Sequence, residues 1–376
     1  MAETQQSKTI EGIGLLVGMI IGAGLFALPY GFMKAGFGWS LFLFAAILAM
    51  SFILHYLYAA IIYITPGRHR FTGYMRRYLG KNAEYAALLF TFFGYYGSML
   101  AYGVLGAIFL GNIFGLEFYR SGVLFFVAGG LLFFSSLRAV GKINFYLTLP
   151  LLAFILLLAW KLWPSVDFGN FSPPAFPERF LPYGILLFAF AGYSALPDLH
   201  DVLGGNARGL SKKIIFWSLI VAALFYLIFI LAVLGATGAG TTPDALSGLY
   251  GVLGKSAVVV GSLIGFLAVF TSYIVFGADL RMTFEYDYGF HKFSSWLVAF
   301  LPPVFLFWSG FTDLVKILSI VGSVGLGVFT LFTVLVGWRE REKLESFLGF
   351  KPQGWWLFPL GALIVLGALS DVFSLF

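Results

Sequence analysis

Backbone groups, rather than catalytic side chains, offer the clearest chemistry in this sequence. The stretch from Gly18 to Pro29 reads GMIIGAGLFALP and lies in an apolar segment, residues 10–33, that is long enough to cross a bilayer. A membrane helix that breaks near the midplane, here at Gly22-Ala23-Gly24, frees N–H and C=O groups. These groups can hold the carboxylate of a small zwitterion and a monovalent cation. The alternative is close helix packing, because Gly18 and Gly22 also have small-xxx-small spacing.

A second stretch of the same kind lies five apolar segments later. It reads GILLFAFAGYSALPDLHDVLGG from Gly184 to Gly205, with a weak point at Ala191-Gly192-Tyr193-Ser194 followed by Pro197. Two interrupted helices in corresponding halves are typical of transporters built from inverted repeats, whose binding site lies between the breaks. With five helices in each half, the first helix starts inside and the sixth starts outside. The pair of stretches therefore favours a binding site over mere packing.

The composition indicates an integral membrane protein that must position these breaks with helices. The 376 residues are 60% hydrophobic and 11% charged, with a mean hydropathy of +0.94, whereas soluble domains carry about 25% charged residues. The absence of cysteine excludes disulfides, thiol catalysis and cysteine metal sites. Eleven apolar segments of spanning length follow one another, at residues 10–33, 38–64, 84–114, 121–137, 143–163, 181–201, 212–236, 254–280, 294–310, 313–337 and 354–374.

These segments predict an all-α membrane protein with 11 transmembrane helices in a 5+5 inverted repeat plus one extra C-terminal helix. The predicted parts are a first repeat at 1–163, an extracellular loop at 164–180, a second repeat at 181–337, and a cytoplasmic loop with a peripheral helix at 338–376. With a cytoplasmic N-terminus, 17 of the 23 Lys and Arg residues fall on the cytoplasmic side. We therefore expect a multi-pass protein of the cell inner (plasma) membrane, with the C-terminus outside.

Three stretches resemble a known group of transporters. The run GMIIGAGLFALPYGFMKAG resembles the first helix of the amino acid/auxin permease family. FAFAGYSALPDL, followed by GGNARGLSKKI, resembles the sixth helix and next loop of that family and of its bacterial aromatic amino acid permease relatives. Ala268-Val269-Phe270-Thr271-Ser272 resembles the A-x-x-T-S sodium-ligand run of sodium-coupled transporters with the leucine-transporter fold. The resemblance implies amino acid transport by alternating access, with discontinuous first and sixth helices.

The resemblance also implies a substrate site. The N–H groups around the first break, helped by the helix dipole, would receive the substrate carboxylate, and carbonyls near the second break would receive the ammonium. The implied substrate-binding residues are Gly22, Ala23, Gly24 and Leu25 in the first segment, Tyr95, Ser98 and Tyr102 in the third, and Phe190, Ala191, Gly192, Tyr193 and Ser194 in the sixth. We place no charged side chain at the middle of these segments, so the expected substrate is net neutral.

The same resemblance implies a sodium site. Hydroxyls of Thr271 and Ser272 would bind Na⁺, and the carbonyls of Ala268, Val17 and Ile20 would complete the shell. The alternative is that both hydroxyls bond back to carbonyls of their own helix. Coupling to H⁺ usually requires a titratable group at membrane depth, and segment five has neither Lys nor a carboxylate at residues 144–160. The sequence therefore favours Na⁺ and keeps H⁺ as the alternative.

The predicted function is import of neutral, apolar or aromatic amino acids by alternating access, coupled to an ion gradient. The alternatives are a proton-coupled aromatic amino acid permease and a non-transporting amino-acid sensor of the same fold. Asp279 and Arg281 are expected to pair with Lys8 or Glu11 as a cytoplasmic gate. The four histidines lack metal-site spacing, and no hydrolase or nucleotide-binding motif is present, so we expect no enzyme and no cofactor besides the coupling ion. The expected partners are the substrate and the lipid bilayer, without nucleic acid, and we expect a monomer.

Overall fold

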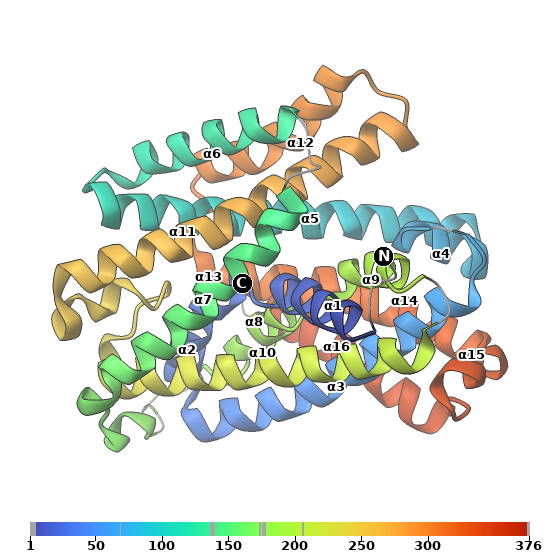
Figure 1. Cartoon of the computed structure of the whole chain (residues 1–376), viewed down its shortest axis with the longest axis horizontal. Coiled ribbons are helices and arrows are strands. Elements are labelled where there is room, and N and C mark those ends of the chain that lie inside the picture. Colours follow the sequence, from blue (N-terminus) through green and yellow to red (C-terminus); the bar gives the residue numbers. More distant parts are fainter. Residues whose placement is uncertain are drawn as a thin grey trace.

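The computed structural model describes residues 5–67, 69–135, 140–172, 174, 178–204 and 207–373, and the regular elements among them are helices (Figure 1). Helices satisfy every backbone group within one segment, as a bilayer requires. The α-helices are α1 (Gln5–Ile20), α2 (Gly24–Ala35), α3 (Phe37–Ile64), α4 (Phe71–Leu79), α5 (Lys81–Phe114), α6 (Phe118–Ser135), α7 (Val140–Leu162), α8 (Leu181–Ala189), α9 (Leu196–Val202), α10 (Arg208–Thr237), α11 (Tyr250–Met282), α12 (Lys292–Trp308), α13 (Leu314–Ile320), α14 (Leu326–Arg339), α15 (Arg341–Leu348) and α16 (Gly354–Phe373).

The predicted apolar segments coincide with described helices or with broken pairs of helices. By length and composition, six described helices can cross a membrane, or seven when α1 and α2, which are bent by 52° relative to each other, are counted as one span. Three shorter apolar helices lie at Phe118–Phe134, Lys292–Trp308 and Gly354–Ser370. The all-helical membrane fold is therefore confirmed, and the number of eleven crossings stays a prediction.

Both predicted breaks are present. The first helix stops at Ile20 and resumes as α2 at Gly24, and the sixth stops at Ala189 and resumes through a 3₁₀ turn, Tyr193–Ala195, into α9. The two broken helices touch at this level, because a Cβ added to Gly24 would lie 2.7 Å from the Cα of Ala189. Glycine is needed there for backbone-to-backbone contact.

Long helices pack around the breaks. The α5 helix packs most extensively against α11, and α6 and α12 lie together on one side of this pair (Figure 1). Aromatic rings fill the gaps that glycines leave: the ring of Phe126 lies where a Cβ on Gly103 would be, and Phe125 fills the same position at Gly106. Without a hydrophobic force between helices in lipid, this van der Waals fit stabilises the bundle.

Candidate functional site

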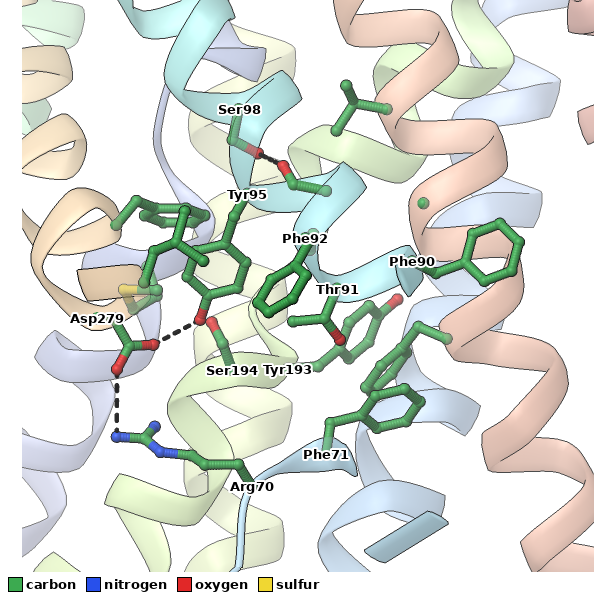
Figure 2. A pocket seen from close by; sticks show the side chains of 18 of the residues that line it. Arg70, Phe71, Phe90, Thr91, Phe92, Tyr95, Ser98, Tyr193, Ser194 and Asp279 are labelled. Atoms are coloured by element: carbon green, nitrogen blue, oxygen red, sulfur yellow. Dashed lines mark hydrogen bonds and ion pairs between the residues drawn. The ribbon is translucent and has the colours of Figure 1, made fainter. Parts of the chain in front are cut away.

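A cavity of about 200 Å³ lies beside the two breaks. It extends along α5 from Leu88 to Tyr102, which corresponds to about 20 Å of helix. Aromatic side chains of the wall come from α3, α4, α5, α8, α11 and α14 and from the turn after α8. They are Tyr58, Phe71, Phe90, Phe92, Tyr95, Tyr102, Phe188, Tyr193, Phe276 and Phe329. Figure 2 shows part of this wall, with Asp279 and Arg70 at one end and Ser98 at the other. A cavity of this kind suits an aromatic ligand with few polar groups.

At the first break, Gly22 is the predicted carboxylate-binding residue that lines the cavity. A Cβ on Gly22 would meet only the hydroxyl oxygen of Tyr102, at 3.9 Å. The N–H of Leu25 donates to the carbonyl of Gly22 at 3.2 Å, whereas the N–H groups of Gly22, Ala23 and Gly24 have no backbone acceptor among the described residues. Ala23, Gly24 and Leu25 are buried behind Gly22. The break therefore offers unpaired amides next to the cavity.

At the second break, Ala191, Tyr193 and Ser194 line the cavity. Two other predicted contacts do not line it. Phe190 packs against the rings of Phe44 and Tyr226, with centroids 5.2 and 5.3 Å away, and Gly192 lies against the side chains of Ile20 and His55. The α8 helix continues through Ala189, and in its last turn the side chain of Phe188, rather than that of Phe190, lines the cavity.

The three polar residues predicted on α5 lie on one face of the helix and line the cavity together. Tyr95, Ser98 and Tyr102 are spaced i, i+3 and i+7, which places them on one side of an α-helix. The hydroxyl of Ser98 donates to the carbonyl of Gly94 at 2.7 Å. The ring of Phe276, on α11, contacts both tyrosines, with centroids 5.0 and 5.6 Å away.

A tyrosine that the sequence analysis did not single out joins the two breaks. The hydroxyl of Tyr226, on α10, lies 2.7 Å from the carbonyl oxygen of Ile20 and 2.7 Å from that of Ala189. These are the last residues of α1 and α8, whose carbonyls are left unpaired where a helix stops. Tyr226 is fully buried. The sequence around Tyr226 is a long apolar helix, and no local pattern in it indicates that this tyrosine bonds to the ends of two other helices.

Charged residues gather at the other end of the cavity in a group that we call the Arg70 cluster, formed by Arg70, Tyr95, Asp198 and Asp279. The hydroxyl of Tyr95 donates to Oδ2 of Asp279 at 2.5 Å. Nη2 of Arg70 lies 3.6 Å from Oδ1 of Asp279 (Figure 2). Its Nη1 lies 3.8 Å from Oδ2 of Asp198. Burial opposes the charge of Arg70, but the two carboxylates outweigh it and hold the pKa of Arg70 above its ordinary value.

The predicted gate pairing is therefore wrong. Asp279 pairs with Arg70 rather than with Lys8 or Glu11, and Arg281 pairs with Glu285 one turn further along, at 2.9 Å. Arg70 lies between α3 and α4 and reaches Asp279 on α11, a contact that spacing along α11 alone does not reveal.

The predicted sodium ligands make helix contacts in this conformation. The Thr271 hydroxyl donates to the carbonyls of Leu267 and Ala268 at 2.9 and 3.1 Å, and the Ser272 hydroxyl donates to Ala268 at 3.0 Å. The carbonyl of Val17 accepts from the N–H of Ile21 at 2.8 Å. That of Ile20 accepts from Tyr226, as described above.

A second cavity, of about 250 Å³, lies between α1 and α11. Gly18 and Met19 line it on one side, and Val275 and Phe276 line it on the other. None of the five predicted sodium ligands lines this cavity, and the sodium site stays a prediction. Among the described residues, no group of three or more His, Cys, Asp or Glu side chains could hold a metal ion.

Comparison with known families agrees with this architecture. The sequence model of the tryptophan/tyrosine permease family matches residues 5–366. The chain belongs to this family. The tyrosine-specific transport system 1 of Haemophilus influenzae is 24% identical over 390 residues, which cover 96% of this chain and 95% of that protein.

Solved structures confirm the leucine-transporter type of fold. MhsT in complex with L-phenylalanine superposes with a TM-score of 0.70 at 14% identity, covering 97% of this chain and 98% of MhsT. A manganese transporter of Eremococcus coleocola superposes with a TM-score of 0.65 at 13% identity, covering 99% of this chain and 86% of the transporter. The family membership thus supports the resemblance at the level of amino acid permeases.

Proposed function

We propose that the protein imports aromatic amino acids by alternating access, as a tryptophan/tyrosine permease within the broader amino acid/auxin permease group. The observation that carries this proposal is the meeting of two broken helices beside a cavity lined by aromatic rings. Broken membrane helices present freed backbone dipoles to a small zwitterion, and the rings offer apolar surface to its side chain. MhsT, a protein of the same fold, was solved with L-phenylalanine.

In the proposed pose, the substrate carboxylate lies at the unpaired amides around Gly22, at the N-terminal end of α2. The positive end of the α2 dipole favours an anion there. The ammonium lies at the carbonyls of the second break, near Ala191, and the ring extends into the cavity between Tyr193 and Phe276. No Lys or Arg lines the upper part of the cavity near Gly22, among the lining residues described, which suits a zwitterion better than a charged side chain.

Membrane placement follows the charge distribution. We propose an inner-membrane protein with a cytoplasmic N-terminus and an outward C-terminus, two five-helix inverted repeats followed by α16, and a monomeric functional unit. With this orientation, the Arg70 cluster closes the cytoplasmic end of the cavity, because Arg70 follows α3 at the end predicted to be cytoplasmic.

Sodium is the coupling ion that we propose first. Thr271 and Ser272 carry hydroxyl oxygens at neighbouring positions of α11, and oxygen is the ligand type that hard cations prefer. Proton coupling is the second candidate, and Asp279 favours it. The structure brings this carboxyl group to the cavity wall, where a titratable group of the kind that proton relays use was not expected from the sequence.

Uptake of radiolabelled tyrosine into proteoliposomes separates these candidates. We expect an imposed Na⁺ gradient to drive uptake, and Thr271→Ala to lower the sodium-dependent rate at least tenfold. Thr333→Ala is the matched control, because the buried Thr333 hydroxyl makes the same bond to its own helix, at 2.8 Å to Phe329. Uptake driven by a pH gradient, unaffected by Thr271→Ala and lost in Asp279→Asn, would replace sodium by protons. Saturable binding without uptake under either gradient would indicate a sensor.

A further inference from the structure

The carboxylate of Asp279 is the charged acceptor on a cavity wall that is largely apolar and rich in aromatic rings. Of the groups that line the cavity, the charged ones are Asp279 and Arg70. Arg70 offers donors only, whereas a carboxylate offers two oxygens and about four acceptor positions. We propose that Asp279 recognises a hydrogen-bond donor on the aromatic ring of the substrate, so that the protein selects tyrosine and tryptophan over phenylalanine. This inference rests on the proposed transport of aromatic amino acids.

Asp279 retains acceptor capacity toward the cavity. Its Oδ2 accepts one hydrogen bond, from Tyr95. Its Oδ1 faces Arg70 across 3.6 Å, which is longer than a hydrogen bond. Among the described residues, no other donor to this carboxylate is present. A phenol O–H or an indole N–H that enters the cavity can therefore bond to Asp279 without displacing Tyr95.

The distance between the break and the carboxylate matches an aromatic amino acid. The hydroxyl of Tyr102 faces Gly22 at the first break, and that of Tyr95 contacts Asp279. These two tyrosines are seven residues apart on α5, which corresponds to about 10 Å along the helix. A tyrosine molecule has a similar length from its carboxylate to its hydroxyl. A substrate held by its carboxylate at the break therefore brings its ring donor to the level of Asp279.

The ring slot between these two ends is already formed. Phe276 lies along one side and contacts both Tyr95 and Tyr102. Tyr193 lines the cavity from the second break and is held in place by stacking on Phe329, with centroids 4.6 Å apart. We expect the substrate ring to pack against these rings. Discrimination then depends on what lies at the end of the slot, and Asp279 lies there.

The rival interpretation gives Asp279 the substrate ammonium. An ammonium contact is common to every amino acid, so it would affect tyrosine and phenylalanine equally. A ring contact affects only substrates that carry a ring donor. The ratio of the dissociation constants of a ligand without a ring donor and a ligand with one therefore separates the two interpretations.

The experiment measures equilibrium binding to the purified full-length protein in detergent. The ligands are tyrosine, phenylalanine and 4-fluorophenylalanine, which is close to tyrosine in size but lacks the donor, with tryptophan and 1-methyltryptophan as a second pair. We expect the unmodified protein to bind the donor-bearing ligand of each pair about tenfold more tightly. This factor corresponds to the lower end of the free-energy range for hydrogen bonds to charged groups. The lower end applies because the Asp279 side chain is 27% exposed.

Two substitutions of Asp279 complete the test. Asp279→Leu, which keeps the branched shape without an acceptor, should bring both ratios close to one while phenylalanine binding persists. Asp279→Asn, which keeps one acceptor oxygen, should give intermediate ratios. Asp198→Leu is the matched control, because Asp198 is the other carboxylate paired with Arg70 but does not line this cavity. It should leave both ratios unchanged.

Each other outcome has a stated meaning. Equal binding of all ligands by the unmodified protein would overturn the inference and leave aromatic transport intact. A parallel loss of tyrosine and phenylalanine binding in both Asp279 variants would also overturn it, in favour of an ammonium contact or a structural role. If no aromatic amino acid binds to the unmodified protein, the proposed function itself fails.

Discussion

Tyr226→Phe tests whether one hydroxyl stabilises both helix breaks. The substitution removes a single oxygen atom and leaves the ring, so packing in the fully buried site is preserved. The carbonyls of Ile20 and Ala189 then both lose the donor that lies 2.7 Å away. The stability of the protein should therefore fall, because a buried acceptor without a donor carries a desolvation penalty.

The size of the loss follows from two known ranges. Side-chain hydrogen bonds in membrane proteins contribute about 0.6 kcal/mol on average and about 1.7 kcal/mol at most. A buried polar group left without a partner costs about 1–3 kcal/mol. Because one hydrogen serves two acceptors, Tyr226 satisfies them only in part, and we expect the free energy of unfolding to fall by about 2 kcal/mol.

Tyr273→Phe is the matched control for this substitution. Tyr273 is as deeply buried as Tyr226, but its hydroxyl has no hydrogen-bond partner among the described residues. Removing that hydroxyl should leave stability unchanged or raise it, because an unpaired polar group leaves the interior. Unfolding of both variants in mixed detergent micelles, followed by tryptophan fluorescence, gives the comparison. Equal stabilities of the two variants would refute the role of Tyr226 at the breaks.

Two further predictions concern access to the cavity. Gly24→Ala should prevent folding, because its Cβ would lie 2.7 Å from the Ala189 backbone. Gly22→Ala should fold and lose substrate affinity, because the nearest neighbour of its Cβ would be 3.9 Å away. Size-exclusion chromatography tests folding, and ligand binding tests affinity. Arg70→Gln should speed the reaction of Ser194→Cys with a membrane-impermeant maleimide, because Arg70 ties its loop to α9 and α11. The chain has no natural cysteine, so an unchanged rate would show that Arg70 does not restrict access.

Local patterns predicted those parts of the site that depend on one segment at a time. The glycines of the first and sixth segments indicated the breaks, because glycine and proline act on the backbone wherever they occur. Helical spacing placed Tyr95, Ser98 and Tyr102 on one face of α5, and all three line the cavity.

Side-chain direction next to a break was less predictable. Phe190 was expected in the site, but the cavity receives Phe188 instead. The rotation of a helix about its axis at the point where it stops depends on what packs around it. Here Phe44 and Tyr226 take up the ring of Phe190, and neither residue belongs to the sixth segment.

By itself the sequence determined the helical membrane fold, the two breaks and the apolar character of the site, because these follow from hydropathy and from local backbone preferences. The tertiary structure alone decided which distant polar groups meet: Tyr226 with the two helix ends, and Arg70 with Asp279 and Asp198. In a protein interior such groups must find partners. The choice of partner is made by helix packing, over distances along the chain that no local pattern spans.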